Sequence, residues 1–127
     1  MQLKLLKSKI HNVHCTFTNV EYNGSVSIDR DLMDDAGFYA NEAVLVADVE
    51  NGHRFETYVI PAPRGSGTIG VNGSAAHLTS VGHRLIIMAF CYLTADEAGR
   101  HVASVVLVKE GNRRSAIEKN PSHTDDH

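Results

Sequence analysis

The sequence predicts a mainly β protein, folded as a small closed or nearly closed barrel with a few short helices. Six or more short segments rich in β-branched and aromatic residues alternate with Gly, Asn and Pro turn residues. The segments with helix signals are few and short. The length of 127 residues suits one domain built around one core.

The clearest strand signals belong to a hairpin in the middle of the chain. Residues 43–49 and 54–60 flank Asn51-Gly52 and are expected to pair. Residues 85–92 are nearly all apolar, which indicates a buried strand. Further strands are expected at residues 10–17, 68–71 and 104–108.

Short helices are expected at three places. Residues 29–36 carry acidic side chains early and are followed by Gly37, a usual helix end. Thr94 and Glu97 have the spacing of a capping box. Residues 74–78 are expected to form one more turn.

The pattern dissolves from Lys109 onward, where acidic and basic residues are equally frequent and little is apolar. We therefore expect residues 1–111 to form the domain and residues 112–127 a flexible tail.

Composition narrows the function classes. A formal net charge of −3 gives no general attraction for nucleic acid. Cys15 and Cys91 are far apart, a pattern typical of a reduced cytosolic protein. No apolar run approaches the roughly 20 residues of a membrane span or has the form of a signal peptide. We expect a soluble cytoplasmic protein with no membrane partner.

Two motifs have weak support. Residues 65–70 fit GxGxxG, but β-type residues follow where a dinucleotide site needs a helix, so a simple glycine-rich loop is favoured. His11, His14 and Cys15 are close in sequence, but alternation would put His14 on the opposite face of a strand. No metal site is expected.

Other candidate residues keep two interpretations each. Lys7, Lys9 and His11 alternate, as on a solvated strand edge or in an anion pocket. Arg54 and Tyr58 share a strand face and fit a carboxylate ligand and a proton donor, or ordinary strand positions.

Asn23-Gly24-Ser25 raises the sharpest question. Asn-Gly between Tyr22 and Val26 is a common two-residue hairpin signal. The serine directly after the glycine also suits chemistry at the peptide bond between them. No GxSxG elbow supports an ordinary hydrolase.

Four segments in this order resemble the pyruvoyl-dependent aspartate 1-decarboxylase family: KSKIH, YNGSVSID, NGHRFETYVI and RGSGTIGVNGSAAH. The resemblance runs without evident gaps over residues 1–111. It implies a six-stranded double-psi β-barrel, usually a homotetramer with active sites between subunits. Barrel patterning alone does not specify the psi topology.

The resemblance implies that the chain cuts its own Gly24–Ser25 bond. An N-to-O acyl shift, elimination and hydrolysis would convert Ser25 into a covalent pyruvoyl group, with no metal and no pyridoxal cofactor. Thr57 matches the family residue that assists this processing. L-Aspartate would form a Schiff base with the pyruvoyl group and lose CO2, and protonation by Tyr58 would give β-alanine for the pantothenate pathway or a specialised one.

The resemblance also implies a substrate-binding set. Arg54 would bind a substrate carboxylate, and a neighbouring subunit would supply Lys9 and His11. The other implied substrate-binding residues are Tyr22, Thr57, Asn72, Gly73, Ser74 and Ala75. Whether processing needs a maturation factor stays open.

Four residues depart from the family pattern, namely Asn19, Glu21, Ser74 and His83. Asn19 could affect processing and Ser74 the acid preference, although isolated substitutions usually change little. Two alternatives therefore stay open. The chain decarboxylates another small acidic amino acid, or it is an uncleaved, non-catalytic barrel of the same fold.

Overall fold

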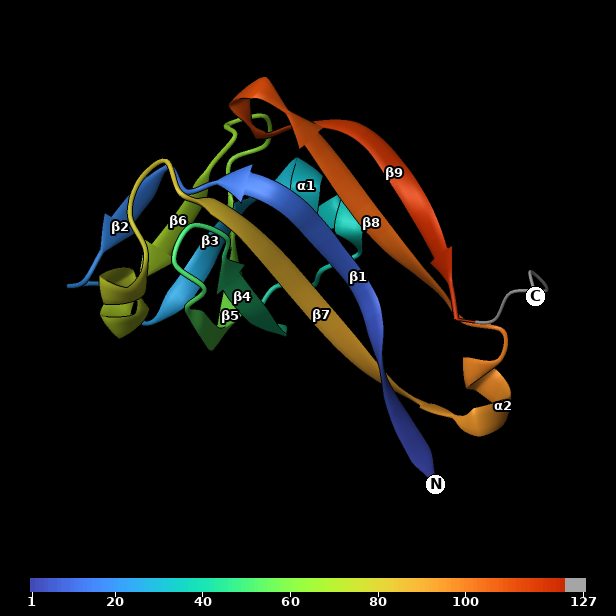
Figure 1. Cartoon of the computed structure of the whole chain (residues 1–127). Coiled ribbons are helices and arrows are strands. Elements are labelled where there is room, and N and C mark those ends of the chain that lie inside the picture. Colours follow the sequence, from blue (N-terminus) through green and yellow to red (C-terminus); the bar gives the residue numbers. More distant parts are fainter. Residues whose placement is uncertain (123–127) are drawn as a thin grey trace.

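A computed structural model describes residues 1–122 and shows a nine-stranded sheet with two short α-helices (Figure 1). The expectation of a mainly β chain with few short helices is confirmed. The expected count of six strands is not, because nine strands form one hydrogen-bonded order, β2-β6-β3-β5-β4-β7-β1-β8-β9. Hydrogen bonds between the described residues do not close this sheet.

The elements have the following bounds. The strands are β1 (Gln2–His14), β2 (Phe17–Asn19), β3 (Ser25–Asp29), β4 (Ala43–Asp48), β5 (Arg54–Ala62), β6 (Ile69–Asn72), β7 (Arg84–Thr94), β8 (Val102–Lys109) and β9 (Arg113–Pro121). The α-helices are α1 (Arg30–Ala36) and α2 (Ala95–Ala98), and the 3-10 helices are η1 (Gly73–Leu78) and η2 (Glu110–Asn112).

The sheet wraps around one buried apolar cluster, as expected for a small β-barrel. Alternate residues of the strands point into it, among them Ile10, Val26, Val59, Val71 and Ile87, all with 0% exposure. The residues between them therefore point to the other face of the sheet, and the polar side chains of β3 lie there.

Strands β1 and β7 are the longest of the described strands, and together with β8 and β9 they extend away from β2–β6 toward α2 (Figure 1). Their pairing is antiparallel, with register shifts between Leu6 and Ser8 and between Ile10 and Val13. The first shift lies at Lys7 and interrupts the alternation expected for Lys7, Lys9 and His11. Lys7 forms an ion pair of 2.9 Å with Glu42 instead of joining the other two.

The hairpin expected around Asn51-Gly52 is confirmed. Strands β4 and β5 pair antiparallel, with Ala47 opposite Arg54. The buried Asp48 carboxylate organises the loop between them, because it accepts the backbone N–H of Glu50 at 2.8 Å and contacts His83 at 2.8 Å.

The hairpin signal at Asn23-Gly24 was wrong. Strands β2 and β3 do not pair with each other; β2 pairs parallel with β6, and β3 pairs antiparallel with the same strand. Neither Asn23 nor Gly24 has the positive φ that a primed turn needs. Strands β2 and β3 flank β6 in the sheet, so the segment between them crosses from one side of β6 to the other instead of forming a hairpin turn.

All three helix signals are confirmed, and the turn expected at residues 74–78 is part of the 3-10 helix η1. The Asp29 carboxylate accepts the N–H of Asp31 at the start of α1, and Gly37 ends the helix in the left-handed region with a φ of 70°. Thr94 and Glu97 form the expected capping box of α2.

The structure differs from the expected flexible tail at residues 113–121. These residues form β9, which pairs antiparallel with β8 from Arg113 opposite Lys109 to Pro121 opposite Val102. The free edge of β8 supplies backbone partners, and Ile117 packs against the core. Residues 123–127 lie outside the described part of the chain.

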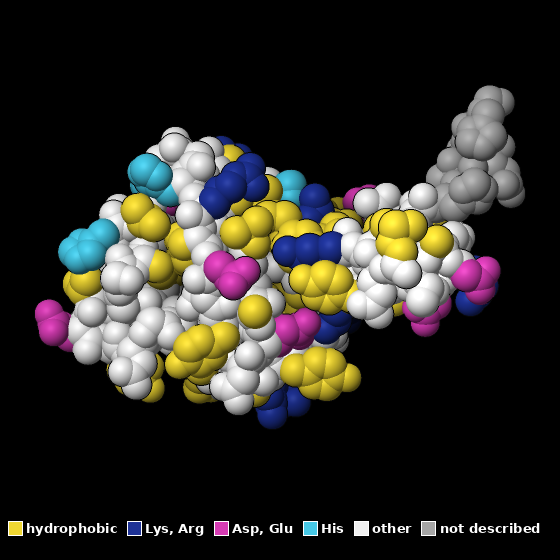
Figure 2. Space-filling model, turned by 90° about the horizontal axis from the view of Figure 1, so that it is seen from below, with side chains coloured by type: hydrophobic (Ala, Val, Ile, Leu, Met, Phe, Trp, Pro, Cys, Tyr) yellow, Lys and Arg dark blue, Asp and Glu magenta, His cyan; other side chains and the backbone are white. Residues whose placement is uncertain are grey.

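Hydrophobic side chains reach the surface at several separate places, visible from below in Figure 2. The most exposed large ones in the described chain after Met1 include Tyr39, Tyr92, Val81 and Tyr22. Single exposed apolar residues of this kind are normal in folded proteins.

Candidate functional site

Ser25 is the first residue of β3, and its hydroxyl lies between a hydrogen-bond acceptor and a hydrogen-bond donor. Its hydroxyl donates to the Asn23 carbonyl at 3.0 Å and accepts from the side-chain amide of Asn72 at 3.0 Å. Ser25 is 1% exposed and Asn72 is 2% exposed. The hydroxyl next to the Gly24–Ser25 bond is therefore buried and oriented.

The register of β3 and β6 creates this contact. Ser25 lies opposite Asn72 in the antiparallel ladder, so the two side chains share one face of the sheet. Ser27, two residues further along β3, points the same way and also accepts from the Asn72 amide, at 3.1 Å. We did not anticipate Ser27 from the sequence, although the two-residue period of a strand places it beside Ser25.

Gly73 lies directly against Gly24. A Cβ added at Gly73 would lie 2.6 Å from the Gly24 Cα and 2.8 Å from the Gly24 nitrogen. Gly73 also has a φ of 77°, which side chains rarely adopt. Only glycine allows the start of η1 to approach the backbone of residue 24 this closely.

The segment that precedes Ser25 is exposed. Residues 20–24 lie outside any strand or helix, and the Asn19 side chain organises their start by accepting the N–H of Glu21 at 3.1 Å. Asn19 and Glu21, two of the departures from the family pattern, therefore interact directly. Tyr22 is 53% exposed.

Tyr58 and Thr57 of β5 lie beside the start of β3, and Arg54 lies four residues before Tyr58 at the start of β5. Val26 faces Val59 in the parallel ladder of β3 and β5, which puts Ser25 at the level of Tyr58 and Gly24 at the level of Thr57. Arg54 is exposed and Tyr58 is 37% exposed. Arg54 has no ion-pair partner among residues 1–122, so its guanidinium is available to an anion.

Ser74 and Ala75 follow Gly73 in η1. Ser74 is exposed, whereas Ala75 packs against the core. The hydroxyl at position 74, another departure, therefore faces solvent near the segment that carries Asn72.

Lys9 and His11 lie elsewhere in the chain. They line a groove of about 460 Å³ on β1, together with Val105 and Leu107 of β8 and three residues of β9, Glu118, Lys119 and Asn120. The Nδ1 atom of His11 is buried and has no partner among the described residues. In the strand order, β5, β4 and β7 lie between β1 and β3. The structure thus separates Lys9 and His11 from Ser25 along the sheet.

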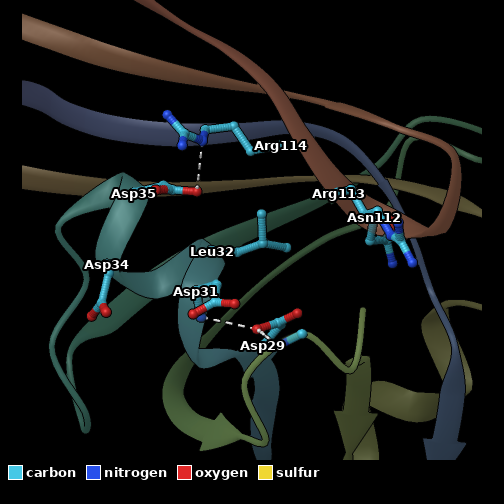
Figure 3. Close-up of a pocket in the computed structure, with 9 residues that line it drawn as sticks. Asp29, Asp31, Leu32, Asp34, Asp35, Asn112, Arg113 and Arg114 are labelled. Carbon is cyan, nitrogen blue, oxygen red and sulfur yellow. Dashed lines mark hydrogen bonds and ion pairs between the residues drawn. The ribbon is translucent and has the colours of Figure 1, made fainter.

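A larger hollow, about 560 Å³, lies between α1 and the start of β9 and contains none of the expected site residues (Figure 3). Its acidic side chains are already paired, because Arg64 contacts Asp31 and Asp34, and Arg114 lies 3.4 Å from Asp35. Burial raises the pKa of Asp35, and its acidic neighbours add to this effect against the opposing charge of Arg114. We interpret this hollow as a structural junction.

The glycine-rich loop belongs to the same junction. The Asp29 carboxylate accepts the N–H groups of Gly65 at 3.1 Å and Gly67 at 2.9 Å. A protein carboxylate thus occupies the donors that a phosphate would need, and β6 rather than a helix follows. Residues 65–68 therefore form the expected glycine-rich loop, whereas Ile69 and Gly70 already belong to β6.

Asn112 is a second residue that sequence reasoning missed. Its side chain accepts the N–H of His14 at 2.8 Å and donates to the carbonyls of His14 at 2.9 Å and Gly67 at 2.8 Å. It thereby fastens the start of β9 to β1 and to the glycine-rich loop. An isolated Gly-Asn pair in a polar stretch gives no signal for such a role.

Residues 1–122 contain neither a cluster of metal ligands nor a helix that could span a membrane. No group of three or more His, Cys, Asp or Glu side chains is arranged to hold a metal ion. Within this part of the chain, no helix is long and apolar enough to cross a membrane.

The family model and the similar proteins that match this chain all carry the name aspartate decarboxylase or aspartate 1-decarboxylase. A family model described as "Aspartate decarboxylase" matches residues 1–115. A protein named aspartate 1-decarboxylase from Caldicellulosiruptor saccharolyticus is 46% identical over 125 residues, which cover 98% of each chain. Proteins of the same name from Hyphomonas neptunium and Clostridium acetobutylicum are 49% and 44% identical, covering 88% and 97% of this chain and 95% and 97% of their own lengths.

Proposed function

The chain belongs to the aspartate decarboxylase family, and from this premise we propose that it works through a pyruvoyl group made from its own Ser25. It is an aspartate 1-decarboxylase, a lyase that converts L-aspartate to β-alanine and CO2. The observation that carries the pyruvoyl proposal is the buried hydroxyl of Ser25, held by Asn72 beside the backbone of Gly24.

In the proposed cleavage, Ser25 Oγ attacks the carbonyl carbon of Gly24. The peptide C–N bond breaks, and an ester forms between Gly24 and the Ser25 side chain while the Ser25 amine is released. Loss of the Cα proton and of the ester oxygen then leaves a free Gly24 carboxylate and a dehydroalanine. Water hydrolyses this group to pyruvoyl and ammonia, so the products are residues 1–24 and a larger fragment that begins with the pyruvoyl group.

The chain's own groups suit this first step. The Asn72 amide stabilises the oxygen of Ser25 as its hydroxyl loses a proton. Gly24 has no side chain, and open space surrounds its Cα on the side where a Cβ would stand, so nothing there blocks rearrangement of its carbonyl. Thr57, at the level of Gly24 in the adjacent strand, is proposed to donate to the developing oxyanion.

The pyruvoyl group supplies a carbonyl that accepts electrons when CO2 leaves an attached amino acid. Two of the residues proposed to act on the substrate, Arg54 and Tyr58, lie on one face of β5. Arg54 binds a carboxylate, and Tyr58 delivers the proton that completes β-alanine. Asn72, Gly73, Ser74 and Ala75 line the site, with Tyr22 nearby.

We further propose that the active enzyme is a homotetramer with the double-psi barrel topology. Lys9 and His11 lie in a groove that β5, β4 and β7 separate from Ser25, which supports a site completed by a neighbouring subunit. The buried Nδ1 of His11, which has no hydrogen-bond partner among residues 1–122, supports a polar ligand in that groove. We place the enzyme in the cytoplasm, and a maturation factor is compatible with the exposed loop before Ser25.

The mass of the purified protein under denaturing conditions tests the proposal. We expect two fragments divided between Gly24 and Ser25, with the larger one lighter than a serine-initiated chain because serine has become pyruvoyl. The Ser25→Ala chain should keep its full-length mass and release no CO2 from L-aspartate. A full-length wild-type mass with CO2 release would overturn the pyruvoyl mechanism. Full-length mass without activity would support the non-catalytic alternative.

A further inference from the structure

The chain contains three Asn-Gly pairs, at residues 23–24, 51–52 and 72–73. Asn-Gly is the dipeptide in which the glycine nitrogen most readily attacks the asparagine side chain, because glycine presents no side chain to hinder the approach. The attack forms a five-membered succinimide and releases ammonia. Water then opens the ring to aspartate or to isoaspartate, in which the backbone runs through the former side chain.

The fold restrains two of these pairs. The Asn72 amide is buried and donates to the hydroxyls of Ser25 and Ser27, and Gly73 is packed against Gly24. The amide of Asn51 donates to the Leu78 carbonyl at 2.9 Å, and its oxygen accepts the N–H of His53 at 2.9 Å.

The attacking nitrogen is also restrained in the second pair. The N–H of Gly52 donates to the Asp48 carbonyl at 2.9 Å. Neither the side chain of Asn51 nor the nitrogen of Gly52 can move toward the other without losing these bonds. Closure of the ring there requires local opening of the β4–β5 loop.

Asn23-Gly24 shares the contact between Gly73 and the Gly24 backbone, but it has none of the hydrogen-bond restraints of the other two pairs among residues 1–122. Both residues are exposed, and no hydrogen bond holds the Asn23 side chain or the Gly24 N–H. Open space surrounds the Cβ position of Gly24. Within the described part of the chain, the only hydrogen bond of Asn23 is made by its backbone carbonyl, which accepts the Ser25 hydroxyl at 3.0 Å.

We propose that Asn23 is a site of spontaneous deamidation and isoaspartate formation, selected by the fold over Asn51 and Asn72. The reaction competes with self-cleavage for the same segment of the precursor. Succinimide formation takes the Asn23 carbonyl into a ring, and isoaspartate inserts a methylene into the backbone before Gly24. Either change displaces the acceptor of the Ser25 hydroxyl. A precursor in which Asn23 reacts before self-cleavage therefore cleaves poorly.

The site itself is tested without cleavage. Folded Ser25→Ala protein is incubated in mildly alkaline buffer, and its peptides are mapped by mass and by enzymatic methylation of isoaspartate. We expect a gain of about 1 Da at Asn23, on the order of ten-fold faster than at the two restrained sites. The same chain in denaturant is the control and should modify all three sites at similar rates. Equal rates at Asn23 and Asn51 in the folded chain would overturn the proposal.

The competition rests on the proposed function and is tested in the wild-type chain. After partial processing, the residual full-length chain should be several-fold richer in modified residue 23 than the released fragment 1–24. Glutamine has a longer side chain and closes a ring far more slowly. Any Asn23→Gln precursor that stays uncleaved should therefore keep an unchanged mass. Equal modification in both wild-type pools would refute the competition. If the wild type does not cleave at all, the proposed function fails while the Ser25→Ala result still decides the Asn23 site.

Discussion

The side-chain nitrogen of Asn72 lies 3.0 Å from the hydroxyl oxygen of Ser25, and both side chains are almost fully buried. A buried amide donor next to a serine hydroxyl stabilises negative charge on that oxygen more than water would, because little solvent screens the interaction. The contact is therefore the part of the site most directly tied to cleavage.

Replacing Asn72 by alanine should slow self-cleavage by roughly 100-fold, because the donor to the attacking oxygen is lost. The cleaved fraction is followed by denaturing mass spectrometry after synthesis. Asn51→Ala is the matched control, since Asn51 also begins an Asn-Gly pair but bonds Leu78 away from Ser25. Cleavage of Asn72→Ala at the wild-type rate would show that the contact has no role in processing.

Gly73→Ala should abolish or severely slow cleavage while the protein stays folded. The new methyl group would lie within 3 Å of Gly24 backbone atoms, so the scissile segment must shift. Gly82→Ala is the control, because Gly82 has a φ of 90° but open space around its Cβ position. That variant should lose about 1 kcal/mol of stability from backbone strain and still cleave normally. Normal cleavage of both variants would contradict the steric argument.

Strand patterning predicted part of the site. The two-residue period correctly placed Arg54 and Tyr58 on one face of β5, and the chain order around Asn51-Gly52 gave its hairpin. The same period failed at Lys7, because a register shift moves this residue to Glu42. Such a shift depends on the pairing with β7, which local sequence does not contain.

Long-range pairing also explains the two larger differences. Asn23-Gly24 has the composition of a tight hairpin turn. However, β6 lies between β2 and β3 and pairs with both, so these two strands do not pair with each other. Residues 113–121 have little to bury, yet the free edge of β8 and the Asn112 contacts hold them in β9. Neither partner is recognisable from the local residues.

The Asn112 contacts should be worth about 2–3 kcal/mol of unfolding free energy, because its buried amide makes three hydrogen bonds. Asn112→Gly is the informative variant, since glycine tolerates the φ of 55° found there. Urea unfolding measures the loss. Asn120→Ala, at an exposed position of β9, should change stability by less than about 0.5 kcal/mol. A similarly small effect of Asn112→Gly would mean that β9 is held by its pairing with β8 alone.

Asp48 should make stability depend on acid pH. Burial opposes its ionisation, but contacts with His83 and the backbone N–H groups of Glu50 and Asn51 outweigh that effect and lower its pKa. The contribution is therefore fully present above the ordinary carboxyl pKa of about 4 and is lost as pH falls through the lower, folded-state value.

Urea unfolding of the wild type and Asp48→Asn should show this directly. The variant should be less stable at neutral pH by about 1–3 kcal/mol, and the difference should shrink as pH falls below about 4. Asp96→Asn is the control, because Asp96 is exposed and its ion pair is with Arg100, four residues on in the same exposed segment. A difference between wild type and Asp48→Asn that stays constant with pH would rule out the proposed titration.

A site shared between subunits makes a prediction about mixed assemblies. Lys9→Ala chains lack one proposed half of the site, and Tyr58→Phe chains lack the other, so each homo-oligomer should be nearly inactive. Co-expressed chains that assemble at random should place an intact Lys9 beside an intact Tyr58 in about a quarter of the sites and recover about that fraction of CO2 release. The matched control mixes Arg54→Ala with Tyr58→Phe. Both of these changes lie on β5 of the same chain, so no mixture joins two intact halves. If CO2 release recovers only in the mixture of Lys9→Ala and Tyr58→Phe chains, β1 and β5 of different subunits meet at the site. If neither mixture recovers activity, Lys9 and Tyr58 of one chain belong to the same site.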